Sequence, residues 1–159
     1  MIGVIQRTSG AEVTVERECV AEIERGILLL LGVERDDTQE DARYIAGKVV
    51  HLRIFGDEQG NLNRSLLDTG GKVLVVSQFT LLGDTRKGRR PSFSRAAGHD
   101  HARQLLSLLL KELRSYGVGV EEGVFGAMMD VKLVNSGPVT LIVNSRDGRN
   151  PSCKSYVKQ

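Results

Sequence analysis

The sequence predicts an α+β fold in a single domain, with two helices packed against a mainly antiparallel, barrel-like β-sheet. Three observations support this prediction. The 159 residues, 40% of them hydrophobic, are enough to form a core that needs no disulfide or metal. Short β-rich segments alternate along the chain with two segments of helical periodicity. Finally, no internal repeat or linker divides the sequence.

The first third of the chain is predicted to form strands followed by a helix. Four short β-rich segments, separated by polar or glycine-containing turns, predict an antiparallel meander. They are residues 2–7, 11–15, 20–23 and 26–33. Thr38 and Asp41 then have the spacing of a helix capping box, and apolar residues recur at helical spacing up to about Arg53. We therefore expect the first helix over this stretch.

The rest of the chain alternates again between strand and helix. Residues 56–61 have the composition of a turn, and residues 72–77 predict a buried strand. Leucines at helical spacing predict a second helix from about Ala97 to Gly117. Strand character returns at residues 118–120, 131–135 and 139–144. Residues 146–159 have no apolar periodicity, so we expect a loose tail there.

Charge and cysteine content narrow the class of protein. The 22 Lys and Arg exceed the 20 Asp and Glu by only two, so any basic binding site must be local. Cys19 and Cys153 are the only cysteines, without the spacing of a redox or metal motif. The start of the chain lacks the features of a signal peptide, and no apolar run approaches the ~20 residues of a membrane helix. We expect a reduced cytoplasmic protein that does not insert into a membrane.

Motifs for nucleotides, metals and catalytic triads are incomplete. Gly83 and Gly88 have the separation of P-loop glycines, but arginines stand where that loop carries Lys and Ser or Thr. The histidines His51, His99 and His101 lie in no cluster with the spacing of metal ligands, so structural or surface roles are expected for them. No GxSxG sequence marks a serine nucleophile. A metal or a triad is therefore not predicted.

Two segments carry residues that local structure does not demand. Residues 77–81, Ser-Gln-Phe-Thr-Leu, end the predicted buried strand with three polar side chains around one aromatic, although an edge strand would show the same alternation. Residues 135–140, Asn-Ser-Gly-Pro-Val-Thr, have the composition of an ordinary turn between strands. The bond before Pro138 is of the kind that accepts the cis form readily.

Together, these two segments resemble the signature motifs of the D-aminoacyl-tRNA deacylases, of the bacterial and eukaryotic D-tyrosyl-tRNA deacylase type. The loop at residues 83–93 also resembles the family's loop after the first motif. The similarity covers about residues 1–145 as one domain, and residues 146–159 extend past it. Neither motif departs from the pattern of the family.

The resemblance implies a homodimeric hydrolase that acts without metal or cofactor. Its reaction would be cleavage of the ester that joins a D-amino acid, or mischarged glycine, to tRNA, while L-aminoacyl-tRNA is left intact. The residues implied to form the catalytic segment are Ser77, Gln78, Phe79 and Thr80. Gly137 and Pro138 would form a cis dipeptide that the other subunit inserts into the pocket, where its main-chain atoms exclude L side chains.

Hydrolysis of this ester does not require a catalytic triad or a metal, because an aminoacyl ester is already activated toward water. Backbone N–H groups near Phe79 and Thr80 could stabilise the oxyanion by roughly 10²-fold each. A covalent mechanism with Thr80 or Ser77 as nucleophile remains the alternative, although no adjacent base is evident. We favour attack by water, with the ribose 2′-hydroxyl of the substrate as a helper.

The basic loop supports a competing interpretation. Four cations in five positions suit the phosphates of RNA, and they are Arg86, Lys87, Arg89 and Arg90. The chain would then be a non-catalytic RNA-binding module, or the loop would simply be solvated. A metabolite-binding dimer unrelated to RNA is a third interpretation. Loss of the ester from D-aminoacyl-tRNA would distinguish the enzyme from the other two.

Overall fold

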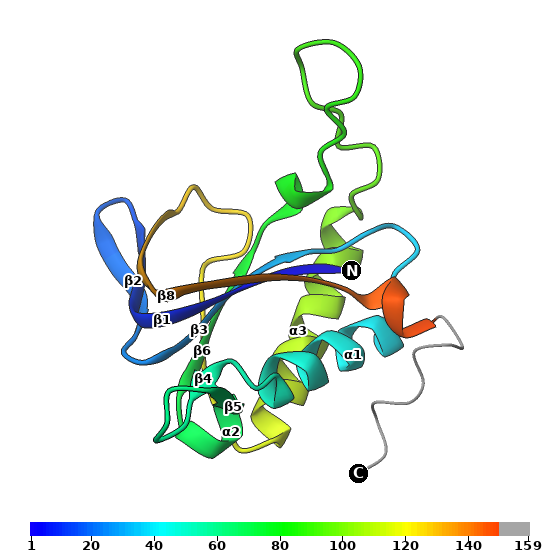
Figure 1. The fold of residues 1–159 in the computed structure, drawn as a ribbon. Helices are drawn as coiled ribbons and strands as arrows, with labels where there is room; N and C mark the ends of the chain where they lie inside the picture. The colour runs from blue at the N-terminus through cyan, green and yellow to red at the C-terminus, as the bar shows by residue number, and fades with distance from the viewer. Residues whose placement is uncertain (150–159) are drawn as a thin grey trace.

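One long strand, β1 (Ile2–Val15), organises the β-sheet of the computed structural model, which describes residues 1–149. The first half of β1 pairs antiparallel with β3 (Gly26–Gly32), and its second half pairs antiparallel with β2 (Glu18–Ile23). Along its other edge, β1 pairs antiparallel with β8 (Asp130–Asn144) over most of its length (Figure 1). Strand β1 therefore pairs antiparallel with three other strands.

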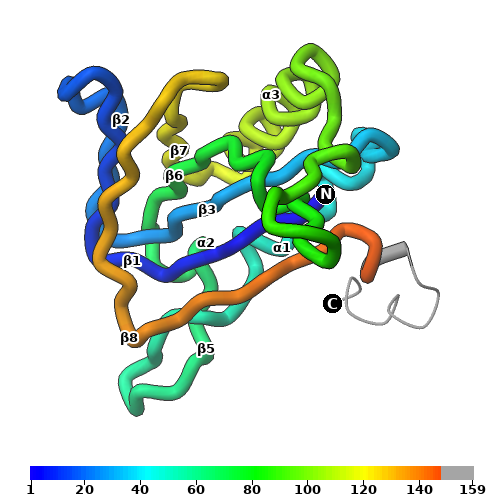
Figure 2. The backbone as a smooth tube through the Cα atoms, turned by 90° about the horizontal axis from the view of Figure 1, so that it is seen from above, coloured from blue at the N-terminus to red at the C-terminus, as the bar shows by residue number. Residues whose placement is uncertain are grey.

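The middle of the sheet is parallel. Strand β6 (Lys72–Ser77) lies parallel to β3, and β7 (Gly119–Glu122) lies parallel to β6. Each of these connections contains a helix, which is the usual way for a chain to return to the same end of a sheet. Because β2 also approaches β6 and β7, the sheet curls into a nearly closed, barrel-like form (Figure 2). The predicted α+β class is confirmed, with a mixed sheet rather than a mainly antiparallel one.

The two predicted helices are present and lie against one face of the sheet (Figure 1). Helix α1 (Gln39–His51) begins with the predicted capping box, in which Thr38 and Asp41 bond to each other's backbone. Helix α3 (His99–Ser115) buries five leucines and begins two residues later than expected. Burial of these apolar faces, rather than helix propensity alone, holds both helices in place.

Alternation along the strands gives the sheet two buried faces. On β3, Ile27, Leu29 and Leu31 pack with the helices. Leu28 on the same strand and Leu74 on β6 pack instead inside the curl of the sheet, with apolar residues of β1 and β2. Side chains on a strand alternate between faces, so one continuous apolar run supplies both cores. The rigid sheet between them determines where the ends of β6 and β8 lie.

Two strand interruptions expected from the sequence are wrong. Strand β1 continues through residues 8–10, and β8 continues through the segment interpreted as an ordinary turn, residues 135–140. Their pairing absorbs the irregular residues as register shifts between Gln6 and Thr8 and between Thr8 and Gly10. The expected meander is also wrong in its order, because β1 lies between β2 and β3.

Short elements complete the described chain. The predicted turn at residues 56–61 connects a small hairpin formed by β4 (Phe55–Gly56) and β5 (Leu62–Arg64). A single helical turn, α2 (Leu66–Thr69), follows and was not expected. None of the helices within residues 1–149 has the length and apolar character that crossing a membrane requires.

The end of β8 leads into a 3₁₀ turn, η2 (Ser145–Arg149). Residues 146–149, expected to belong to a loose tail, thus form part of a regular turn. The rest of that tail, residues 150–159, lies outside the described residues, and Cys153 lies within it. Cys19 is exposed on β2.

Candidate active site

The first motif lies where β6 ends and the chain enters a 3₁₀ turn, η1 (Phe79–Leu82). Ser77 is in register with Leu31 on the neighbouring strand, and the N–H of Gln78 donates to the carbonyl of Leu31 at 2.7 Å. The N–H groups of Phe79 and Thr80 come first in the turn and donate to no acceptor within residues 1–149. The main chain therefore fixes this segment and leaves two backbone donors available.

The side chains of this segment show no activated nucleophile. The amide Nε2 of Gln78 donates a hydrogen bond to the hydroxyl of Thr80. In the described chain, no histidine or carboxylate bonds to the hydroxyl of Ser77 or Thr80. Phe79 is 57% exposed and packs edge to face against Phe93, with ring centroids 5.1 Å apart. The segment thus offers an exposed aromatic ring beside backbone donors.

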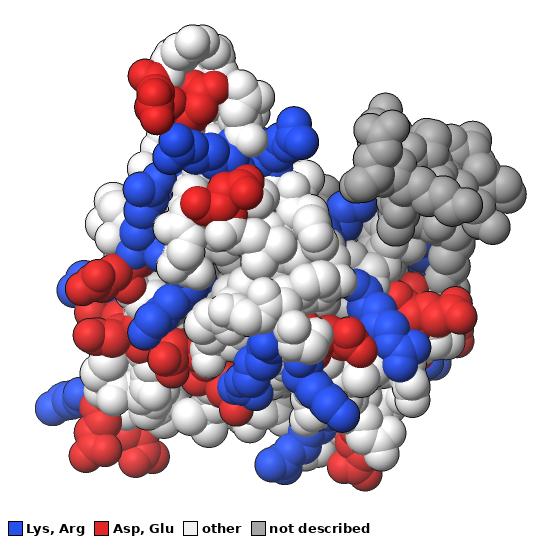
Figure 3. Space-filling model, turned by 90° about the horizontal axis from the view of Figure 1, so that it is seen from below, with Lys and Arg blue, Asp and Glu red and all other residues white. Residues whose placement is uncertain are grey.

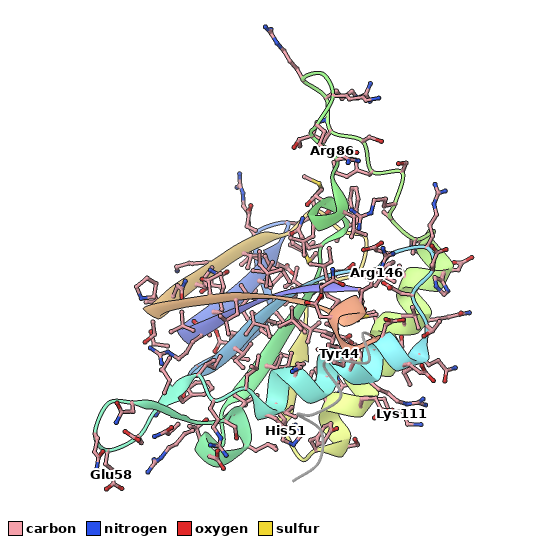
Figure 4. The ribbon with its side chains drawn as sticks, turned by 45° about the vertical axis from the view of Figure 1, so that its right-hand side comes forward. Tyr44, His51, Glu58, Arg86, Lys111 and Arg146 are labelled. Carbon is pink, nitrogen blue, oxygen red and sulfur yellow. The ribbon has the colours of Figure 1, made fainter. Side chains whose placement is uncertain are left out.

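The basic loop forms an arm, residues 84–92, that projects away from the sheet (Figure 1). Two backbone hydrogen bonds between Asp84 and Ser92, of 2.7 and 2.9 Å, close its base. Asp84 also accepts two hydrogen bonds from the guanidinium of Arg86, at 2.9 and 2.6 Å. Arg86, labelled on the arm in Figure 4, is therefore committed to an ion pair within the arm.

The remaining cations of the arm are unpaired. Lys87, Arg89 and Arg90 are exposed and form no ion pair with any residue that the structure describes. By contrast, the face opposite the arm carries positive and negative side chains interspersed around an uncharged area (Figure 3). The arm is thus a local concentration of positive charge on a chain with a nearly balanced total.

The second motif lies within β8, at the irregular part of its pairing with β1. The bond between Gly137 and Pro138 is cis, as expected, and Gly137 has a φ of 122°. Nearby, Asn135 donates to the hydroxyl of Thr140 at 2.7 Å and accepts the N–H of Val139 at 3.1 Å. These bonds fold the strand around the dipeptide.

Arg7 holds this segment from β1. Its Nε donates to the carbonyl of Ser136 at 3.0 Å, and its Nη1 donates to the carbonyl of Ile54 at 2.6 Å. A Cβ atom on Gly137 would lie only 2.4 Å from Nη2 of Arg7. The sequence predicts no role for Arg7, because a single arginine in a strand has no distinguishing local pattern. Its partners become visible only when β1 and β8 are paired.

Within one chain, the two motifs lie at different ends of the sheet. Ser77 is in register, through Leu31 on β3, with Gly3 near the start of β1. Gly137 lies instead beside Arg7, between the pairs that join β8 to β1. The separation from position 3 to position 7 is about 13 Å along the strand, and three strand spacings across the sheet add to it. One chain therefore does not bring the motifs together.

Apolar side chains are exposed around both motifs. A loop at residues 123–129 runs beside the end of β6, where the N–H of Gly123 donates to the carbonyl of Val75 at 3.0 Å. Exposed large apolar residues occur on this loop, on β8 and on η1: they are Val124, Met128, Val134, Leu141, Ile142 and Phe79. An exposed apolar surface of this kind is typical of an interaction site.

The histidines occupy structural or surface positions. His51 bonds to the carbonyl of Gly47 at 2.8 Å, and His101 bonds to the carbonyl of Asp37 at 3.0 Å. His99 packs against Phe125. Among residues 1–149, no three His, Cys, Asp or Glu side chains are placed to hold a metal ion together.

Comparison with known proteins matches residues 4–144 to the family model described as D-Tyr-tRNA(Tyr) deacylase. A D-aminoacyl-tRNA deacylase of Thermus aquaticus is 58% identical over 147 residues, which cover 92% of this chain and 97% of the relative. A second one, from Anoxybacillus flavithermus, is 56% identical and covers 90% of this chain and 98% of its own length. Both relatives match almost from end to end.

Solved structures share the fold. The c-Myc DNA unwinding element binding protein superposes with a TM-score of 0.84 at 37% identity, covering 91% of this chain and 98% of its own. A probable eukaryotic D-amino acid tRNA deacylase superposes with a TM-score of 0.77 at 20% identity, covering 89% and 97%, and so supports the fold alone. With the family model spanning nearly the whole described chain and relatives more than half identical, this chain belongs to the D-aminoacyl-tRNA deacylase family.

Proposed function

We propose that this chain hydrolyses the ester bond of D-aminoacyl-tRNA, and of glycine mischarged on tRNA, while rejecting L-aminoacyl-tRNA. The observation that carries the proposal is the family match over residues 4–144, in which both motifs are complete. Such a reaction releases free amino acid and tRNA and protects translation from the wrong chirality. Because charged tRNA is used in the cytoplasm, we place the protein there.

The test is incubation of the purified protein with tRNA carrying a D-amino acid, glycine or the matching L-amino acid. We expect loss of the D and glycyl esters, in the presence of EDTA as well as without it, and persistence of the L ester. RNA binding without ester loss would instead support a non-catalytic RNA-binding module. Neither binding nor ester loss would favour a metabolite-binding dimer.

Catalysis would come from the main chain of the first motif. The free N–H groups of Phe79 and Thr80 suit the stabilisation of an oxyanion, and neither hydroxyl nearby has a base to activate it. Water would therefore attack the ester carbonyl, helped by the 2′-hydroxyl of the substrate's ribose. The Ser77, Gln78, Phe79 and Thr80 side chains would shape the pocket around that carbonyl.

A proline substitution tests the backbone donor directly. Proline lacks the N–H but is accepted at the first position of a helical turn, and Phe79 occupies that position in η1. Phe79→Pro should lower kcat by roughly 10²-fold relative to Phe79→Ala, which loses the same ring but keeps the donor. Equal rates for the two variants would exclude a catalytic role for the N–H of Phe79.

The complete site would form only in a homodimer. The two motifs are far apart within one chain, and apolar residues surround both of them on the surface. In a symmetric dimer, Gly137 and Pro138 of each subunit would reach residues 77–80 of the other. There the main chain of the dipeptide would block an L side chain, whereas a hydrogen or a D side chain would avoid it.

Subunit mixing tests this arrangement. Dimers of Phe79→Pro alone and of Gly137→Ala alone should each be nearly inactive. After dissociation and random reassociation, about half of the dimers contain one subunit of each kind, and each of these has one intact site. We expect about a quarter of the wild-type activity to return. No recovery, or full activity in a monomer measured by light scattering, would contradict a shared site.

The arm would hold the acceptor end of tRNA through its phosphates. Lys87, Arg89 and Arg90 are the available cations, and Arg86 supports the arm through its pair with Asp84. Contacts to phosphates do not read bases and weaken with salt. Replacing both Arg89 and Arg90 by Ala should therefore weaken binding to every tRNA and reduce the slope of log K against log salt by about 1.5 to 2.

A further inference from the structure

A buried carboxylate lies at the root of the arm. Glu34 follows β3, and its side chain is only 3% exposed. Its Oε1 accepts a hydrogen bond from Nη2 of Arg95 at 2.8 Å, three residues after the arm ends at Ser92. Its Oε2 accepts one from Nη2 of Arg146 in η2 at 2.5 Å. One carboxylate thus joins the arm's root to the segment that follows β8.

The main chain reinforces the same attachment. The N–H of Arg35 donates to the carbonyl of Arg95 at 3.1 Å, and the N–H of Ala97 donates to the carbonyl of Val33 at 2.9 Å. Residues 34 and 96 form an isolated β-bridge between these bonds. The returning root of the arm is therefore fixed to the end of β3, a strand of the rigid core.

The other root of the arm, where the chain enters it, directly follows the candidate catalytic segment. The N–H of Gly83 donates to the carbonyl of Thr80 at 3.0 Å, at the point where η1 ends and the arm begins. Phe93, on the returning root, packs against Phe79 in η1. The angle between the arm and residues 77–80 is thus determined by contacts at the base, since residues 85–90 are exposed and the arm projects away from the sheet (Figure 1).

Among the contacts at the base of the arm, those of Glu34 are the strongest, because its carboxylate is both charged and buried. Hydrogen bonds between a carboxylate and guanidinium groups are stronger than neutral ones, and a buried carboxylate depends on them. Arg95 and Arg146 are about half exposed, at 51% and 45%. Removal of either arginine therefore leaves Glu34 one charged partner.

We propose that Glu34 is a positioning residue for tRNA binding. Through Arg95 it holds the arm at the angle at which Lys87, Arg89 and Arg90 meet the phosphates while the ester lies at residues 77–80. This inference rests on the proposed function. The pair with Arg146 lies on the other oxygen and stabilises only the segment after β8.

Three variants separate positioning from simple stabilisation. Arg95→Gln should raise KM for D-aminoacyl-tRNA by roughly three- to tenfold, the effect of losing one charge-assisted hydrogen bond, with kcat unchanged. Arg146→Gln removes the matched bond on the same carboxylate and should lower the melting temperature without changing KM. Glu34→Gln should raise KM at least as much as Arg95→Gln does.

The Glu34→Gln variant also excludes direct binding of Arg95 to RNA. It removes no cation, so a direct contact predicts unchanged or tighter binding, whereas positioning predicts weaker binding. Amide hydrogen exchange supplies a local measure: the N–H groups of Asp84 and Ser92, which close the arm, should exchange faster in Glu34→Gln and Arg95→Gln but not in Arg146→Gln.

Other outcomes would overturn the proposal. They are equal KM changes in Arg95→Gln and Arg146→Gln, an unchanged KM in Arg95→Gln, or a fall in kcat alone. If the wild-type protein does not hydrolyse D-aminoacyl-tRNA, the proposed function fails first. Positioning is then judged on the affinity of the same variants for an uncharged acceptor-stem RNA, where the same order of effects is expected.

Discussion

The two motifs of the candidate site are held in place by different means. Residues 77–80 continue a central parallel strand, and main-chain hydrogen bonds to Leu31 and within η1 fix them. Gly137 and Pro138 lie in an irregular outer strand, where the guanidinium of Arg7 fixes the chain around them. Activity should therefore tolerate changes of side chain in residues 77–80. At the second motif, activity should depend on the absence of a side chain at Gly137 and on the presence of the Arg7 side chain.

The largest effect is expected at Gly137. An added methyl group would lie 2.4 Å from Nη2 of Arg7, and the φ of 122° is one that L residues rarely adopt. Gly137→Ala should lower kcat/KM for D-aminoacyl-tRNA by roughly 10²-fold, since it displaces both the dipeptide and Arg7. Gly60→Ala is the matched control, because Gly60 also has a positive φ but has nothing within 4 Å of its Cβ position. Similar losses in both variants would mean that backbone conformation, not crowding, is responsible.

A smaller effect is expected when Arg7 is removed. Arg7→Ala loses the bonds to the carbonyls of Ser136 and Ile54, so the dipeptide becomes less well placed. We expect kcat/KM to fall by roughly tenfold and stability to fall by about 1–3 kcal/mol, measured by urea unfolding. Arg43→Ala provides the control, since Arg43 forms surface contacts with Glu112 and Gln39 and lies outside both motifs. An Arg7→Ala enzyme with unchanged kcat/KM would show that this guanidinium is dispensable.

Removal of the hydroxyl of Ser77 or Thr80 should have a still smaller effect on the rate. Ser77→Ala and Thr80→Ala leave the N–H groups of η1 in place, so we expect rates within about tenfold of the wild type. Single-turnover hydrolysis of D-aminoacyl-tRNA measures this. Complete inactivity of a folded Thr80→Ala variant, together with an acyl group trapped on Thr80 in the wild type, would establish covalent catalysis instead. The contrast between the two segments would then disappear.

The smallest effect is expected for the titration of Asp84 at the base of the arm. Hydrogen bonds from the side chain and backbone of Arg86 hold the pKa of Asp84 far below its ordinary value. A carboxyl with a depressed pKa stabilises the folded arm above the pKa of the unfolded chain, and this stabilisation is lost as the pH falls through the folded pKa. Carboxyl NMR should therefore show Asp84 titrating well below ordinary aspartates. In Arg86→Ala its midpoint should rise toward theirs, with little change in overall stability because the pair is exposed.

Local patterns predicted most of the fold. The capping box at Thr38 and the leucine spacing of the second helix are signals within a few residues of each other, and both helices follow them. The continuity of β1 and β8 could not be predicted in this way, because Gly10 and Pro138 are turn residues until a partner strand accommodates them. The parallel pairs were missed for a similar reason: pairing direction depends on which strand the chain reaches after each helix.

The same distinction between local and distant signals applies to the residues of the candidate site. Residues 77–80, Gly137, Pro138 and the basic loop were identified from sequence because each is a contiguous motif. Arg7 and Glu34 were not, since each acts on partners more than 40 residues away. Arg86 was grouped with the RNA-binding cations because it lies next to them in sequence, and its bidentate bond to Asp84 became visible only in the structure.

The sequence by itself determined the helices, the apolar strands, the two motifs and the family, because those properties are encoded in neighbouring residues. Only the tertiary structure decided that the motifs lie at different ends of one sheet and that Glu34 is buried between two arginines. The physical reason is that register, strand order and burial are set by the packing of the whole core, to which every segment contributes at once.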